Sequence, residues 1–278
     1  QRSPARYYQR PDAEHFALDT TRTSLAGYNS VVAVTKLSGQ WLGSLTLQDK
    51  SPGYETNDVG AERFTNRRAA ATDVGYATYR PGRLFRNYRV DFFTTHEWDY
   101  DWNRITFDIG LKQAARFKNF WKATLTTNFY PVTIDDHLTR GGPLALAPSA
   151  RMVNVQVNSD SRRRHTFGLG TMYFWTTKGA HTLALTPSLT LKPGSNLQIA
   201  LTPSLTFNHD PAQYVQTETD PTAAATFGGR YVFGELQQTE VAFETRVNWT
   251  FTPTLSLQLY VQPLISANEF RDYKELRA

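Results

Sequence analysis

The clearest pattern in the chain is a strict alternation of apolar and polar residues between positions 182 and 208. The apolar residues of the first arm are Leu183, Leu185, Pro187, Leu189 and Leu191, and those of the second are Leu197, Ile199, Leu201, Pro203, Leu205 and Phe207. The residues between them are mostly small hydroxyl and amide residues, and a Pro-Gly-Ser-Asn turn at 193–196 joins the arms. A period of two predicts strands with one apolar and one polar face. Arms of about ten residues are longer than the usual soluble strand and favour transmembrane strands.

The same alternation recurs along most of the chain. Further predicted strands lie at 28–37, 40–48, 70–79, 88–98, 104–113, 120–130, 151–158, 166–176, 227–235, 239–251 and 255–266. With the two arms of the hairpin, about 13 strands and no helix are predicted. The predicted fold class is therefore all-β, a transmembrane antiparallel up-and-down β-barrel with about 13–14 visible strands that form part of a larger barrel.

The connections between the predicted strands differ in length. Long polar connections at 49–68, 131–149 and 210–225 all follow even-numbered strands, whereas the turns after odd-numbered strands are short. Outer-membrane barrels have short periplasmic turns and long extracellular loops, so the long connections are predicted to be extracellular. The first strand would then start outside the cell and the last would end in the periplasm.

An odd strand number conflicts with the even number of single-chain bacterial barrels, so we expect upstream strands to be missing. The first and last predicted strands should then pair with upstream strands of the same precursor or with another chain, because bare edges are costly in lipid. Three regions are predicted: an irregular loop or lumen-packed segment at 1–27, the barrel strands and loops at 28–266, and a periplasmic tail at 267–278.

Composition narrows the class of protein. The mean hydropathy is −0.48 and no run of 18 apolar residues occurs, which excludes a helical membrane bundle. Aromatic residues make up 13% of the chain, as aromatic girdles at both membrane surfaces require. The net charge of +5 is scattered, and its one tight cluster, 162–164, lies where a turn is expected, so no nucleic-acid partner is predicted. A soluble β-sandwich is the alternative to a membrane barrel.

Two prolines interrupt the central hairpin. Pro187 and Pro203 lie at equal distances from the turn and should face each other. Since each removes a backbone N–H donor from the strand ladder, locally broken pairing or a bulge is expected there.

Motifs for chemistry are weak throughout. Asp99, Asp101 and Asn103 have the spacing that opens an EF-hand loop, but Arg104 and Gly110 replace its Gly and Glu, which favours an acidic loop. His137 lies beside two aspartates at 135–136, yet the six histidines are dispersed and no G-x-S-x-G motif occurs. We predict no enzyme activity, no catalytic residues, no cofactor and no metal.

Several spaced blocks resemble a known family. They read RSP at 2–4, YYQRPD at 7–12, TSLAGY at 23–28, SPGYETNDVG at 51–60, LTRGGP at 138–143, SDSR at 159–162, YVFGEL at 231–236 and LSLQLYVQP at 255–263. Together they resemble the C-terminal domain of unknown function in large bacterial proteins that carry an N-terminal family 9-like carbohydrate-binding module. The resemblance implies the distal part of a barrel in the outer membrane of Gram-negative bacteria. The carbohydrate-binding module is outside this chain, so no sugar-binding residue is carried over.

Two functions fit these expectations. The first is an outer-membrane channel or porin-like transporter for polar solutes, surrounded by outer-membrane lipid. Its expected lumen-lining residues are Arg89, Asp91, Arg104, Asp108, Lys112, Lys122, Glu244 and Arg246. The second is a plugged structural barrel that anchors a partner or a surface assembly.

Overall fold

The computed structural model describes residues 8–16, 19, 21–56 and 64–276. In this part of the chain fifteen β-strands form, with one short 3-10 turn and no α-helix. The described part of the chain contains no helix that is long and apolar enough to cross a membrane. The strands are β1 (Asn29–Lys36), β2 (Trp41–Lys50), β3 (Arg67–Thr78), β4 (Phe85–Trp98), β5 (Arg104–Phe117), β6 (Lys122–Tyr130), β7 (Thr133–Asp135), β8 (Ala145–Ala147), β9 (Ala150–Asn158), β10 (His165–Thr176), β11 (His181–Gly194), β12 (Leu197–Thr219), β13 (Gly229–Thr252), β14 (Leu255–Val261) and β15 (Leu264–Glu275); the 3-10 turn η2 spans Ala224–Thr226.

Thirteen of these strands form one antiparallel sheet in which sequence neighbours lie side by side, and β7 and β8 form a separate two-stranded sheet. The predicted all-β, up-and-down antiparallel arrangement is confirmed. Threonine and aromatic residues are frequent in these segments, and they fit a pleated surface. Tight turns join the strands: Gly39 and Gly179 take φ angles of 92° and 93°, which glycine adopts without steric cost.

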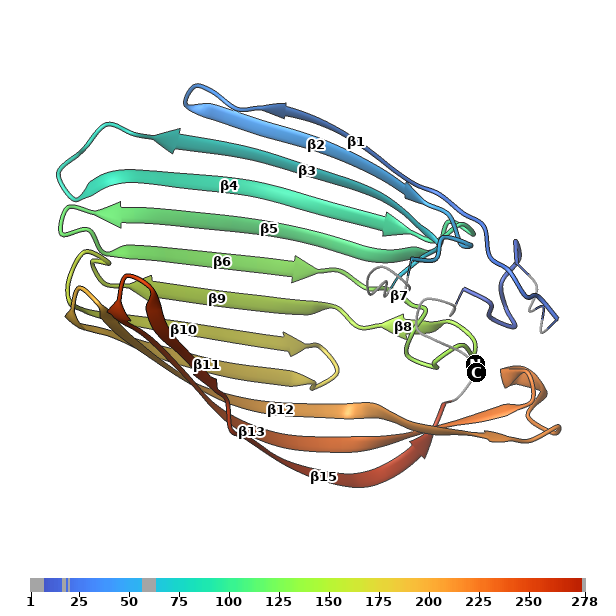
Figure 1. The fold of residues 1–278 in the computed structure, drawn as a ribbon. Coiled ribbons are helices and arrows are strands. Elements are labelled where there is room, and N and C mark those ends of the chain that lie inside the picture. Colours follow the sequence, from blue (N-terminus) through green and yellow to red (C-terminus); the bar gives the residue numbers. More distant parts are fainter. Residues whose placement is uncertain (1–7, 17–18, 20, 57–63, 277–278) are drawn as a thin grey trace.

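The sheet is curved and open (Figure 1). Its order runs from β1 at one edge to β13, whose outer edge pairs with both β14 and β15. No pairing joins β1 to β14 or β15 among the described residues, so the expectation that the chain does not close on itself is confirmed.

Three boundaries differ from the prediction. The predicted strands at 227–235 and 239–251 are one strand, β13, and the predicted loop at 210–225 is shorter because β12 continues to Thr219. The last strand was expected to end at 266 with a tail after it, but β15 continues to Glu275. Pro263 lacks a donor and interrupts this last strand, yet the backbone N–H of Phe243 still donates to the Pro263 carbonyl at 3.0 Å.

These differences change the strand parity. Since β14 and β15 lie end to end along β13, the thirteen strands fill twelve positions, and the odd count is wrong. Asn29 at the start of β1 pairs with Lys50, beside the long β2–β3 connection. Glu275 at the end of β15 pairs with Val232, near the start of β13. Both outer strands therefore have their free ends at the end of the sheet with the long connections, hereafter the loop end, and the expectation that the last strand ends at the opposite side is wrong.

The register aligns the alternating faces of all the strands. Leu191 pairs with Ile199, which pairs with Val247, which pairs with Leu259. The leucine, isoleucine and valine positions are hereafter the apolar parity, and the alternate positions are the polar parity. On the polar parity, Ala200 pairs with Arg246, and Arg246 pairs with Tyr260. Because directly paired residues lie on the same face of a sheet, the chain forms one continuous apolar face and one polar face.

The polar face is the concave one. Ala77, Asp91, Asn128, Ala150 and Ala242 are buried, and all five have the polar parity. Large apolar side chains of the other parity are exposed, among them Val74 at 54% and Phe92 at 50%. Side chains crowd together inside a curved sheet and spread apart outside it, so this contrast assigns the polar face to the inside of the curve.

Aromatic rings collect at both ends of the apolar face. At the end with the short turns, Trp41 packs against Tyr76 with ring centroids 5.2 Å apart. At the loop end, Tyr173 stacks on Trp175 at 5.1 Å. The band between these positions is mostly aliphatic, with Leu189 and Leu201 in it, and also contains Phe92 and Phe243. An apolar band with an aromatic row at each end is typical of a membrane-facing sheet.

The two prolines face each other as expected. Between β11 and β12 the ladder is interrupted from Leu185 to Leu189, and the register is the same on both sides of the gap. The outcome is therefore broken pairing without a bulge at this position, since neither proline can donate.

Candidate functional site

The concave face carries a charge cluster on strands β3–β5. The Arg89 guanidinium donates to Asp91 at 2.6 Å and lies 3.5 Å from Asp73. Lys112 is paired with Asp91 in the β4–β5 register, which places its ammonium group on the same face. Two cations and two carboxylates therefore lie together, and their charges largely cancel.

Glycines make room for this cluster. A Cβ at Gly75 would collide with the Asp91 carboxylate, and one at Gly110 would collide with the Phe93 ring. Both glycines have the polar parity and are buried. Crowding on the inside of the curved sheet thus explains why glycine occupies strand interiors that it otherwise weakens.

A second polar pair lies beside the first. Both carboxylate oxygens of Asp108 accept from the side-chain amide of Asn128, at 2.8 and 3.0 Å. Near the loop end, the hydroxyl of Thr106 donates to Glu97 at 2.7 Å. The acidic groups of β4 and β5 are therefore held by neighbouring side chains.

Three of the expected lumen-lining residues lie apart from this cluster. Lys122 is paired with Arg116 and Asn158 at the start of β6. Glu244 and Arg246 form their own ion pair at 2.7 Å on β13, with five strands between them and β5 in the sheet.

Arg104 differs in orientation. A register shift between Glu97 and Trp98 sets Arg104 opposite Trp98, and its guanidinium lies 5.3 Å from the centroid of the Phe107 ring. Phe107 and Trp98 belong to the apolar parity. The structure therefore directs Arg104 toward the aromatic row of the apolar face rather than toward the cluster.

The N-terminal segment is tied to the loop end. Arg10 is fully buried, and its guanidinium lies 3.1 Å from Asp12, 3.3 Å from Asp99 and 3.7 Å from Asp101. Asp99 is also fully buried and accepts from the backbone N–H of Asn103 at 2.8 Å. The acidic loop that resembles the start of an EF-hand thus binds an arginine, as a structural contact.

The same segment reaches a second loop. Asp12 accepts from the backbone N–H of Leu144, in the connection between β6 and β9, at 2.6 Å. Residues 8–16 therefore link two loops, and Figure 1 shows the segment beside β7 and β8 at that end of the sheet.

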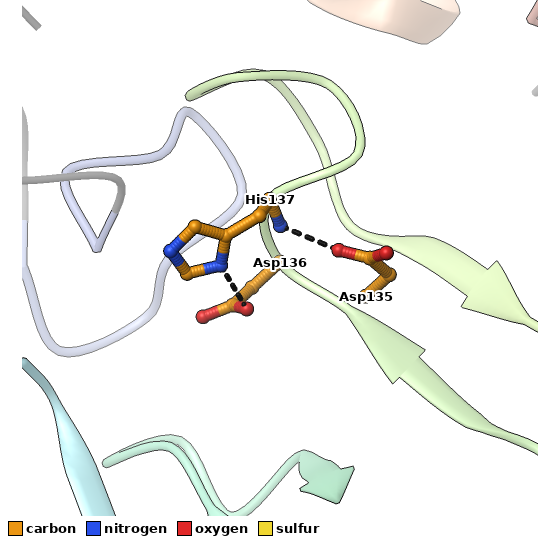
Figure 2. Close-up of side chains that lie close together, drawn as sticks. All are labelled: Asp135, Asp136 and His137. Atoms are coloured by element: carbon orange, nitrogen blue, oxygen red, sulfur yellow. Dashed lines mark hydrogen bonds and ion pairs between the residues drawn. The ribbon is translucent and has the colours of Figure 1, made fainter. Parts of the chain in front are cut away.

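Asp135, Asp136 and His137 form a compact group in the β6–β9 connection (Figure 2). Their ligand atoms lie within 4.8 Å of one another. Asp136 accepts from Arg67 at 2.9 Å and contacts His137 Nδ1 at 2.6 Å, while Asp135 accepts from the backbone N–H groups of His137 and Leu138. Because these oxygens are engaged and Arg67 already supplies a positive charge, the group acts as a loop anchor.

The anchoring contacts lower the pKa of Asp136. Burial would raise its pKa, but the hydrogen bond from His137 and the charge of Arg67 outweigh burial and lower the pKa to about 2. The carboxylate therefore stays ionised at neutral pH, where its contacts hold the connection to the start of β3.

A family match covers residues 6–278, nearly the whole chain, and is described as a domain of unknown function, DUF5916. The chain belongs to the DUF5916 family. No curated protein matches this DUF5916 chain, and no solved structure does.

The expected lumen-lining residues of this DUF5916 chain left out an uncharged row on β9, although the hydroxyl residues of the central hairpin were expected on the polar face. Asn154, Gln156 and Asn158 on β9 form a row of amides opposite the valines of that strand. Thr186 and Ser188 continue the polar lining on β11. The alternation of 151–158 carries this signal, because every second residue of a strand points to the same face.

Proposed function

We propose that this chain forms part of an outer-membrane β-barrel whose concave polar face lines a water-filled channel for polar solutes. The observation that carries the proposal is the continuous division of the sheet into two faces. An exposed apolar band bounded by aromatic rings suits lipid. The opposite face carries balanced ion pairs, amides and hydroxyls, which suit a hydrated lumen without strong charge selectivity.

The sheet has two open edges, which bear on how the barrel is completed. In hydrocarbon each unpaired backbone group costs several kcal/mol, so an open sheet requires further strands along β1 and along β14 and β15. We propose that strands from elsewhere in the precursor or from another chain complete the barrel. The resemblance to the C-terminal part of large proteins with an N-terminal family 9-like carbohydrate-binding module is consistent with upstream strands.

The attachment of the N-terminal segment supports a second candidate, a plugged barrel that anchors a partner or a surface assembly. Residues 8–16 are held by the buried Arg10–Asp99 contact and by the bond from Leu144 to Asp12. A segment fixed in this way at the loop end would obstruct a channel mouth.

Conductance in planar bilayers separates the two candidates. A steady stepwise current from the reconstituted full-length protein, which includes the strands that complete the barrel, supports the channel. Arg89→Gln should then shift the selectivity toward cations, whereas Arg163→Gln, in the exposed turn between β9 and β10, should not. A current that appears only in Arg10→Ala supports the plugged barrel, because that change releases the segment. Silence of both proteins with intact β-structure argues against a channel.

A further inference from the structure

A polar trough follows β10 along the concave face. At one end of the trough, Gly168 is paired with Asn158 on β9 and Ser188 on β11. Gly170 lines the floor and is paired with Gln156 and with Thr186. A row of amides thus forms one wall and a row of hydroxyls forms the other, around a pocket of about 370 Å³.

The walls of the trough are free for a solute. Within the described part of the chain, the side chains of Gln156, Asn158 and Ser188 form no hydrogen bond with another side chain or with the backbone. The charged residues of β4 and β5 differ, since Arg89 is held by Asp91. The trough therefore offers side-chain amides and a hydroxyl whose hydrogen-bonding groups are not used within the described chain.

Gly170 gives independent support. A Cβ at this position would meet the Thr186 side chain at 3.7 Å, an ordinary contact, and its φ angle is not positive. At Gly168, in contrast, a Cβ would lie 2.8 Å from the Asn158 side-chain oxygen and closer still to Ser188. Neighbouring side chains therefore require glycine at 168 but not at 170. Glycine within a strand often marks a place where a ligand approaches the backbone closely.

We propose that this trough binds a neutral polyhydroxylated solute, such as an oligosaccharide, as it passes along the concave face. Amides and hydroxyls both donate and accept hydrogen bonds, which matches the hydroxyl groups of a sugar. The nearest charges are Lys122, paired with Asn158, and Glu244, paired with Thr202, so the middle of the trough offers no counter-charge to an ion. The assignment rests on the proposed function, since it requires a concave face that is open to water.

Equilibrium dialysis of the full chain in detergent micelles tests the assignment, with maltotriose as the probe. Saturable binding is expected. Gln156→Leu should weaken it at least fivefold, because the amide wall loses a donor and an acceptor. Gly170→Val should weaken it at least tenfold, because the side chain fills the floor. The matched control Gln258→Leu removes an amide of the same parity on β14, outside the trough, and should bind like the wild type.

Three results would overturn the assignment: no saturable binding, equal binding by Gln156→Leu and the wild type, or equally tight binding of the carboxylate maltotrionic acid. Conductance of the full-length protein, with the strands that complete the barrel, is measured in planar bilayers in parallel and separates this assignment from the proposed function. Silent bilayers together with saturable maltotriose binding would contradict the channel and retain the trough. Steady conductance without maltotriose binding would do the reverse.

Discussion

The Asp136→Asn variant should loosen the connection between β6 and β9. In the native chain the Asp136 carboxylate lies 2.8 Å from the buried Arg67 guanidinium and accepts from His137. Its pKa of about 2 lies below the ordinary value of 3.8. A shift of about two units corresponds to about 2–3 kcal/mol, since each unit is worth about 1.36 kcal/mol. Arg67 retains its bond to the Asn66 carbonyl, so we expect a loss of about 2 kcal/mol rather than the ~3–5 kcal/mol of a buried charge left without a partner.

Hydrogen exchange of the amides of His137 and Leu138 reports this loss directly. A loss of about 2 kcal/mol should accelerate local opening about 30-fold. Because the folded-state pKa is lowered, the stabilisation is complete above the unfolded value near pH 4 and disappears as the pH falls toward 2. Opening in the wild type should rise over that window, and Asp136→Asn should remove the contribution of this group. Asp160→Asn, in the turn at the opposite end, is the matched control. Unchanged exchange in Asp136→Asn would refute the anchoring role.

Three further outcomes follow from the faces and ends of the sheet. Leu201→Arg places a charge on the apolar face and should destabilise the protein in lipid by about 2–4 kcal/mol if the residue lies near the bilayer midplane. Equilibrium unfolding from vesicles measures this loss, and an unchanged unfolding midpoint would count against lipid contact. Gly110→Leu should cost about 1–3 kcal/mol in the same assay, because its side chain collides with Phe93, and normal stability would contradict the tight packing. A cysteine at Thr222, at the loop end, should react with an impermeant reagent on intact cells while one at Asn119 is protected, and the reverse pattern would invert the orientation.

The alternation of apolar and polar residues predicted the strands well wherever it is unbroken, as in β11. It failed where bulges change the parity. Register shifts between Asp210 and Gln213 and between Tyr214 and Gln216 hide the period of two, so the second half of β12 read as a loop. Another register shift lies between Phe233 and Glu235 in the pairing of β13 with β15. It hides the period of two in the last part of β15, which was expected to be a tail.

The candidate site was predictable only in part. Residues two apart on one strand, such as Arg89 and Asp91, share a face by periodicity alone, so their proximity was expected. The contact of Arg89 with Asp73 depends on the register between strands, which alternation does not fix. The contact between Arg10 and Asp99 joins residues 89 positions apart and has no local signal.

The central claim is that the apolar face contacts lipid while the polar face contacts water. Single spin labels at Thr182, Leu183, Ala184, Leu185 and Thr186, with the protein in lipid vesicles, test it by comparing accessibility to oxygen with accessibility to a water-soluble nickel chelate. The two faces of β11 predict a period of two, with oxygen accessibility highest at Leu183 and Leu185 and chelate accessibility highest at the other three. Chelate maxima at Leu183 and Leu185, or the absence of any alternation, would contradict it.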